Sequence, residues 1–135
     1  MECIFCKIIA KELPAEVIYE DDEILSILDI NPMNFGHTLI MPKLHCSDIL
    51  IMPAYLMPKI FTLAQTIAVA IKESLNADGI NLISNIGEAA GQTVFHTHIH
   101  IIPRHEEDGF KFRLNLKKYD NGELTNIANK IRNSL

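Results

Sequence analysis

The chain has 135 residues, of which 48% are hydrophobic and 21% charged, and its formal net charge is −5. This size and composition are typical of one globular domain with a buried core, so we expect residues 1–135 to form a single domain. The acidic balance argues against nonspecific nucleic-acid binding, which needs a surface rich in lysine and arginine. A small anionic ligand remains compatible with it, because backbone N–H groups and imidazoles can hold a phosphate locally.

The sequence contains neither a secretory signal nor a membrane-spanning run. It begins MECIFCK, without a basic region followed by an apolar one, and has no apolar stretch of about 18 residues. Its three cysteines are an odd number, which disfavours a disulfide framework and makes a metal site the competing use for them. We therefore expect a cytoplasmic protein without membrane association.

Short strands are predicted in the first third of the chain. Residues 17–20 and 23–30 flank two aspartates and predict a hairpin. Residues 37–41 follow a segment dense in turn formers and predict a third strand, which Pro42 is expected to end.

One long helix is predicted over about residues 55–75, where apolar side chains recur every three or four positions. Proline is tolerated only in the first helical turn, so Pro58 suggests that the regular helix begins near Met57.

Two further strands and a short helix complete the expected elements. The alternation at residues 80–84 predicts a fourth strand, and residues 94–102 predict a fifth, ended by Pro103. A short helix is expected near residues 124–131. Because strands and helices are segregated rather than alternating, the fold class is α+β with a mainly antiparallel sheet.

The most informative stretch contains the alternating histidines His96, His98 and His100. In a strand they would share one face at spacings of roughly 7 Å. Burying several imidazoles leaves polar groups to satisfy, so chemistry explains them better than packing does. An adventitious metal-binding tract and a solvated polar face are the alternatives. Near neutral pH imidazole can act as nucleophile, proton donor and phosphate ligand, and the glycine-containing loop at residues 85–93 can approach a phosphate closely.

His96-Thr97-His98-Ile99-His100-Ile101-Ile102 resembles the signature of the histidine triad family, with Thr97 in place of one hydrophobic residue. The similarity covers about residues 3–103 and is strongest to the small nucleotide-binding branch, in particular to its bacterial Cys-x-x-Cys type. It implies a fold with about five strands, one long helix and short N- and C-terminal helices, and leaves residues 104–135 as a C-terminal extension.

The resemblance makes His98 the nucleophile that attacks the α-phosphorus of a purine nucleotide. A covalent nucleotidyl-histidine would form, and water would release a nucleoside monophosphate such as AMP. The phosphate would be held by a set of side chains and backbone groups: His100, His37, Asn85, Gly91 and Thr93.

Other positions match contacts to the rest of the substrate. Gln92 and Thr93 match positions that contact the phosphate or the leaving group, and Asp29 matches the carboxylate that binds the ribose hydroxyls. The apolar pocket for the base would be formed by Phe5, Ile8, Leu13, Ile27 and Ile30. Ordinary core packing would use the same side chains.

Cys3-x-x-Cys6 is half of a zinc site, and the resemblance completes it with His45 and His96. Four such ligands form a closed site, which implies one structural zinc per chain, and no organic cofactor is expected. The alternative is that both cysteines are simply reduced thiols. Cys46 is interpreted as a bystander.

Three functions fit these features. The leading one is hydrolysis of a nucleoside phosphoramidate or a dinucleoside polyphosphate. The others are a nucleotide-binding regulatory or scaffold protein with incidental catalysis, and a module in which the whole histidine strand binds metals. By resemblance alone we expect a homodimer.

Overall fold

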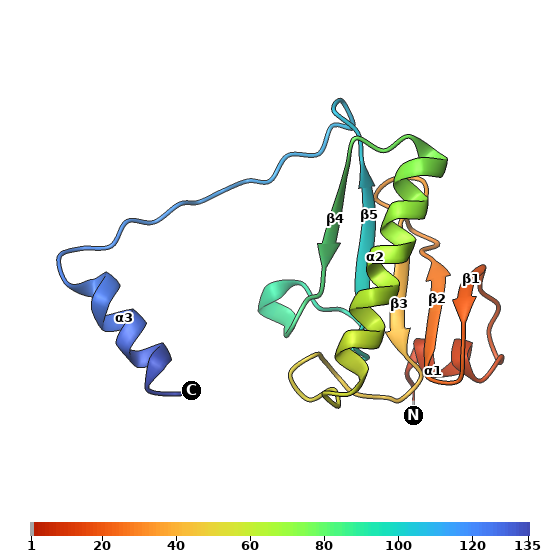
Figure 1. Ribbon diagram of the computed structural model, residues 1–135, viewed down its shortest axis with the longest axis horizontal. Helices are drawn as coiled ribbons and strands as arrows, with labels where there is room; N and C mark the ends of the chain where they lie inside the picture. Colours follow the sequence, from red (N-terminus) through yellow and green to blue (C-terminus); the bar gives the residue numbers. More distant parts are fainter. Residues whose placement is uncertain (1) are drawn as a thin grey trace.

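The computed structural model describes residues 2–135, which form a five-stranded sheet and three helices (Figure 1). The elements in chain order are α1 (Ile4–Ile9), β1 (Val17–Glu20), β2 (Ile24–Leu28), β3 (Thr38–Pro42), α2 (Leu56–Leu75), β4 (Gly79–Ile83), a 3₁₀ turn (Glu88–Ala90), β5 (Ile99–Arg104) and α3 (Glu123–Arg132). The predicted α+β class, with one long helix and short terminal helices, is confirmed.

The sheet order is β1-β2-β3-β5-β4, and every neighbouring pair is antiparallel. The last strand in the sequence is therefore inserted between β3 and β4. His100 in β5 lies opposite Leu39 on one side and Ile83 on the other. This insertion places the end of the histidine stretch inside the sheet rather than at its edge.

Each face of the sheet has its own apolar cluster. Helix α2 covers one face and packs its buried residues Leu56 and Ile60 against inward-facing strand residues such as Ile99 and Ile101. On the other face Phe5 from α1 packs against the following strand residues: Leu25, Ile27, Leu39 and Met41. Because strand side chains alternate, His100 lies on the α1 face, between two isoleucines that face α2.

Helix α2 begins at Leu56, one residue before the predicted start, and Pro58 is its third residue. The proline fits there because backbone N–H groups of a first turn have no partner within the helix. The helix ends at Leu75, and the left-handed backbone of its C-cap Asn76 (φ 51°) turns the Ala77 N–H toward the Lys72 carbonyl at 3.3 Å.

The prediction that Pro42 ends the third strand is confirmed, because β3 ends at Pro42. The prediction that Pro103 ends the fifth strand is wrong, because β5 includes Pro103 and ends at Arg104. The pairing of β3 with β5 ends at Ile40 on one side and at Ile101 on the other. Pro42 lies beyond the first end and pairs only with β2, and Pro103 lies beyond the second and pairs only with β4. Each proline therefore lies where its strand has a neighbour on one side only, so the missing N–H breaks no ladder.

The fifth strand is also shorter at its start than predicted, because β5 begins at Ile99 and not at residue 94. The backbone before it bonds outside the ladder: Thr97 N–H donates to the Cys46 carbonyl at 2.7 Å, and the Ser84 hydroxyl donates to the His98 carbonyl at 3.0 Å. Of the three alternating histidines, only His100 lies in a strand.

After β5 the chain leaves the sheet. Residues 110–120 are extended and unpaired, and α3 lies well away from the sheet at the end of this segment (Figure 1). That residues 1–135 form a single domain with 104–135 as an extension stays a prediction. Across residues 2–135, none of the helices combines the length and apolarity that crossing a membrane requires.

Candidate active site and metal centre

Hydrogen bonding fixes the tautomer of His98. Its Nδ1 lies 2.6 Å from the backbone carbonyl oxygen of His96, which can only accept. The proton of a neutral His98 ring is therefore on Nδ1, and the lone pair is on Nε2. A ring nitrogen with a free lone pair is the form of imidazole that can act as a nucleophile.

A second chain of hydrogen bonds fixes His37 and His100. Met33 N–H donates to His37 Nδ1 at 3.1 Å, so the proton of His37 is on Nε2. His37 Nε2 lies 2.9 Å from His100 Nδ1 and donates to it, which leaves the His100 proton on Nε2. The His98 and His100 rings meet edge to face at 4.9 Å between centroids. The site thus presents an acceptor nitrogen on one imidazole and a donor N–H on the next.

Burial keeps these imidazoles neutral. It lowers the pKa of His98 below its usual value, against the opposing effects of the His96 carbonyl and Asp29. It also lowers the pKa of His37, opposed by Asp29. For His100, burial together with the neighbouring His98 and His37 lowers the pKa from 6.5 to about 4.

His98 and His100 line a pocket of about 570 Å³ on the α1 face of the sheet. Asp29 lies in its wall, with Oδ1 accepting from the Asn31 N–H at 2.8 Å and Oδ2 3.6 Å from His37 Nε2. Most of the predicted substrate residues line this pocket: Phe5, Ile8, Leu13, Ile27, Asp29, Ile30 and Thr93. Ile30 is 84% exposed and Phe5 only 7%, so core packing accounts for the phenylalanine but not for the isoleucine.

Four predicted residues lie outside the lining of this pocket: His37, Asn85, Gly91 and Gln92. The buried Gln92 amide is occupied within the protein, since Oε1 accepts from the Gly87 N–H at 2.8 Å and Nε2 donates to the Ser47 carbonyl at 2.6 Å. Asn85 Nδ2 donates to the Gly91 carbonyl at 3.4 Å. In this structure these side chains shape the loop before the histidines, and their direct contact with phosphate stays a prediction.

The four predicted metal ligands lie close together. Their ligand atoms are all within 4.8 Å of one another, and they belong to Cys3, Cys6, His45 and His96. The Cys6 Sγ to His45 Nδ1 distance is 3.3 Å, and His96 Nδ1 lies 3.5 Å from Cys3 Sγ, 3.6 Å from Cys6 Sγ and 3.2 Å from His45 Nδ1. Tetrahedral zinc with ordinary bond lengths gives edges of roughly 3.3 to 3.8 Å. The donor set therefore fits zinc in both chemistry and spacing.

The other nitrogen of His96 supports the same assignment. His96 Nε2 lies 2.7 Å from the Pro42 carbonyl oxygen and so carries the proton. Nδ1 is then the lone-pair nitrogen directed at the cysteines, which is the tautomer that a metal requires. The His96 ring is thus part of the candidate metal site. The His96 backbone carbonyl is part of the candidate active site, because it accepts the hydrogen bond from His98 Nδ1.

Asp29, His37 and His100 also have ligand atoms within 4.8 Å of one another. Both His37 nitrogens are already used, one accepting from Met33 and one donating to His100. His37 therefore has no free lone pair to offer a metal ion.

Cys46 lies apart from the metal group, buried in the cluster beneath α2. Its Sγ is 3.2 Å from the Thr97 hydroxyl, which also donates to the Cys46 carbonyl at 3.1 Å. This bond explains why threonine is accommodated where a hydrophobic residue was expected.

Several groups that position the site were missed in the sequence. The carbonyl of Pro42 and the N–H of Met33 are backbone groups, which no residue pattern identifies. Ser84 directs its hydroxyl at the His98 carbonyl, and its place at the end of the fourth predicted strand was the one available signal.

Comparisons with known proteins agree with this geometry. The HIT domain family matches residues 10–107, and the chain belongs to that family. The solved structure of a HIT family protein from Bacillus subtilis has a TM-score of 0.93 and 40% identity, and the superposition covers 100% of this chain and 98% of the other.

Two further relatives bear on the site. A Zn-bound histidine triad family protein from Mycobacterium smegmatis is 41% identical with a TM-score of 0.77, over 99% of this chain and 97% of that one. Adenylylsulfatase HINT3 of Arabidopsis thaliana is 48% identical over 107 residues, which are 79% of this chain and 54% of the plant protein.

Proposed function

We propose that this protein is a nucleotide hydrolase acting at the α-phosphate of a nucleoside phosphoramidate or dinucleoside polyphosphate. The observation that carries the proposal is the tautomer of His98, whose Nδ1–H is held by the His96 carbonyl while Nε2 keeps its lone pair. The ring lies in the wall of a pocket large enough for a nucleotide.

In the first step His98 Nε2 attacks the α-phosphorus and forms an N–P bond, while the bond from phosphorus to the leaving group breaks. Water then attacks the nucleotidyl-histidine, the N–P bond breaks, and a nucleoside monophosphate such as AMP leaves. Division into two displacements lowers the barrier of each. The His100 Nε2–H, oriented by His37, donates to the phosphate oxygens as charge develops on them.

The remaining walls suit a purine nucleoside. The Asp29 carboxylate, which lines the pocket, accepts hydrogen bonds from the two ribose hydroxyls. The base packs among the apolar residues of α1 and β2, including Phe5 and Ile27. The adenylylsulfatase name of the plant relative supports adenylyl substrates.

Zinc would be held by Cys3, Cys6, His45 and His96 and is proposed as one structural ion per chain. When bound, it supplies a cross-link between the N-terminal segment, the loop after β3 and the segment before β5. Four protein ligands leave no open position for substrate. We further propose that the enzyme works as a homodimer.

Release of AMP from adenosine 5′-phosphoramidate tests the proposal. His98→Gly is expected to lower the turnover rate by at least about 10³-fold, since the nucleophile is lost. His105→Asn changes a histidine of the turn after β5 and is the matched control, expected to keep the wild-type rate. Equal rates for wild type and His98→Gly, or no AMP from wild type with either this substrate or diadenosine tetraphosphate, would refute the enzyme assignment. The ratio of kcat/KM for the two substrates identifies the leaving group.

A further inference from the structure

Asn34 lies in the tight turn that carries His37. The Met33 N–H donates to His37 Nδ1 at 3.1 Å, and the backbone N–H of His37 donates to the Asn34 carbonyl at 3.0 Å. The turn therefore holds both the ring and the backbone of His37. Gly36 completes it with a φ of 98°, in the left-handed region that favours glycine. Any displacement of this turn must move the His37 ring with it.

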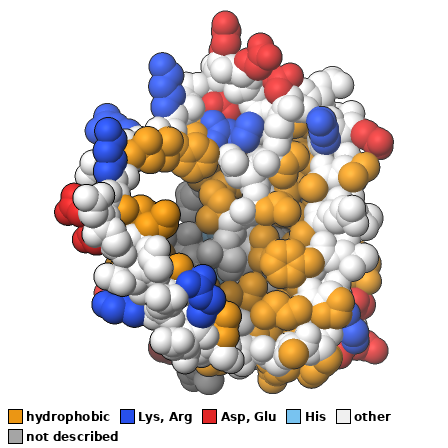
Figure 2. All heavy atoms as spheres, turned by 60° about the vertical axis from the view of Figure 1, so that its left-hand side comes forward, with side chains coloured by type: hydrophobic (Ala, Val, Ile, Leu, Met, Phe, Trp, Pro, Cys, Tyr) orange, Lys and Arg blue, Asp and Glu red, His pale blue; other side chains and the backbone are white. Residues whose placement is uncertain are grey.

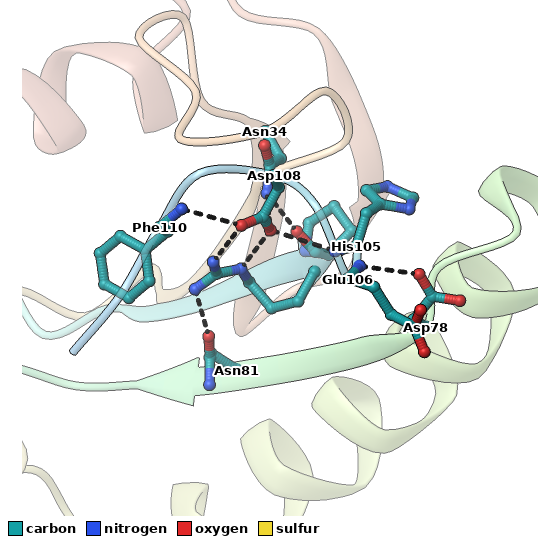
Figure 3. A network of polar contacts seen from close by, with 9 residues as sticks. Asn34, Asp78, Asn81, His105, Glu106, Asp108 and Phe110 are labelled. Atoms are coloured by element: carbon teal, nitrogen blue, oxygen red, sulfur yellow. Dashed lines mark hydrogen bonds and ion pairs between the residues drawn. The ribbon is translucent and has the colours of Figure 1, made fainter.

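The Asn34 side chain joins this turn to the end of β5 and to the turn that follows (Figure 3). Its Nδ2 donates to the Pro103 carbonyl at 2.8 Å and to Asp108 Oδ2 at 3.0 Å. An amide NH₂ group has two protons, so both are used. Pro103 lies three residues after His100 on the same strand. The side chain thus links the turn that carries His37 to the strand that carries His100.

This link lies where the sheet no longer joins the two segments. The pairing of β3 with β5 begins only at Thr38, one residue after His37. Across residues 2–135, the side-chain hydrogen bonds that connect residues 30–37 to β5 come from Asn34 and His37. Strand pairing therefore does not hold the His37 ring at its distance from β5, and the Asn34 amide does.

An ion pair fixes Asp108 in place (Figure 3). The Arg104 guanidinium donates to its two carboxylate oxygens at 2.8 and 2.6 Å, and a further N–H donates to Asn81 Oδ1 at 3.1 Å. The backbone N–H groups of His105 and Phe110 donate to the same carboxylate at 3.1 Å. These bonds, above all those from Arg104, hold the pKa of Asp108 far below its usual range. The carboxylate therefore stays charged and fixed as an acceptor.

The ion pair is largely withdrawn from solvent, although it belongs to a surface turn. On the side of the molecule from which α3 projects, apolar side chains cover much of the surface and most charged ones lie at its edge (Figure 2). Only 16% of the Arg104 side chain and 7% of the Asp108 side chain are exposed. Salt screens such a pair less than an exposed one. The pair can therefore act as a fixed anchor for the Asn34 amide.

We propose that Asn34, anchored by Asp108, is a positioning residue for the reaction. It acts through His37 on His100, the proposed donor to the phosphate, so the inference rests on the proposed function and deepens it. The Asn34 amide holds the turn against β5, and the turn holds His37 Nε2 against His100 Nδ1. The His100 Nε2–H is then directed at the phosphate oxygens. Loss of the amide should affect kcat more than KM, because the added charge on these oxygens is present only in the transition state.

Steady-state kinetics of AMP release from adenosine 5′-phosphoramidate test this role. Asn34→Ala is expected to lower kcat by about tenfold and to change KM by less than about twofold, since a group that stabilises the transition state is displaced. Phe35→Ala changes an 89% exposed residue of the same turn and is the matched control, expected to keep both constants. In an active protein, an unchanged kcat or a change confined to KM would overturn the proposal.

Nuclear magnetic resonance of protein with nitrogen-15 in its histidines gives a readout that does not depend on catalysis. In wild type the rings of His37 and His100 should each show one fixed tautomer, with the proton on Nε2. In Asn34→Ala these signals should show averaging between tautomers, whereas those of His98, held by the His96 carbonyl, should stay unchanged. Identical His37 and His100 signals in both proteins would overturn the proposal. Wild type that releases no AMP, together with these spectral changes, would refute the proposed function and leave the support of His37 by Asn34 standing.

A double-mutant cycle tests whether Asp108 acts through the same side chain. Asp108→Ala removes one acceptor of the Asn34 amide and should lower kcat by less than Asn34→Ala does. The double variant should match Asn34→Ala within about twofold, because both changes break one chain of contacts. Circular dichroism checks that each variant is folded. Losses that multiply in the double variant would overturn the assignment of Asp108 as the anchor.

Discussion

Titration of His100 should make the stability of the protein depend on pH in a predictable way. Burial and the neighbouring imidazoles lower the pKa of His100 from 6.5 to about 4 in the folded protein. Between these values the unfolded chain binds more protons than the folded one, so the free energy of unfolding falls as pH is lowered through 6.5 toward 4. His100 alone should contribute a loss of about 2 kcal/mol between pH 7 and pH 5.

Urea unfolding of wild type and His100→Asn at pH 7, 6 and 5 measures this effect. The asparagine can still accept from His37 Nε2 but does not titrate. Contributions to stability from groups other than His100 are common to both proteins and cancel in the difference. The difference in unfolding free energy between the two proteins should therefore shrink by about 2 kcal/mol on going from pH 7 to pH 5. Parallel pH profiles for the two proteins would show that His100 is not held neutral by its surroundings.

Three further outcomes are expected. Metal analysis of protein purified without chelator should find about one zinc per chain, strongly reduced in Cys6→Ser and retained in Cys46→Ala; metal-free wild type would remove the zinc assignment. Gln92→Ala leaves partly buried backbone groups unpaired and should lower the unfolding free energy by about 1 to 2 kcal/mol. The exposed Gln65→Ala should change it by less than about 0.5 kcal/mol, and equal effects in urea titrations would contradict the bonding described for Gln92. Ile101→Ala, at a fully buried site under α2, should lower the unfolding free energy by about 2 to 5 kcal/mol in the same assay. A decrease below about 1 kcal/mol would contradict the burial of Ile101 in the core.

The sequence predicted the fold class because periodicity records which side of an element is buried. The three-to-four-residue spacing located α2 to within a residue, and the placement of Pro58 in the first turn followed from backbone chemistry alone. The predicted end of the third strand at Pro42 was right, whereas the fifth strand continues through Pro103 to Arg104. Whether a proline breaks a ladder depends on whether a neighbour is present at that position, and that depends on the other strands.

The candidate site was predictable where side chains carry the chemistry. Alternating histidines and a Cys-x-x-Cys are visible as residue types, and the structure brings Cys3, Cys6, His45 and His96 together as the resemblance implied. The expectation that all three histidines lie in one strand was wrong, because the backbone of residues 94–98 bonds outside the ladder.

The tautomers of His37, His96 and His98 could not be predicted from the sequence. They depend on the His96 and Pro42 carbonyls and the Met33 N–H, and every residue type offers such backbone groups. Only the folded path of the chain shows which of them meets an imidazole.

The group that orients His98 is an amide carbonyl, whereas many catalytic histidines are oriented by a carboxylate. A peptide oxygen is not protonated at any pH at which proteins are folded. Its hydrogen bond with the His98 Nδ1–H therefore persists when nearby acidic groups titrate. In the proposed mechanism the ring becomes cationic once Nε2 carries a phosphoryl group, and the carbonyl dipole then faces a positive charge without forming a neutralised ion pair. The proposed nucleophile is thus oriented by a partner that has no titration of its own.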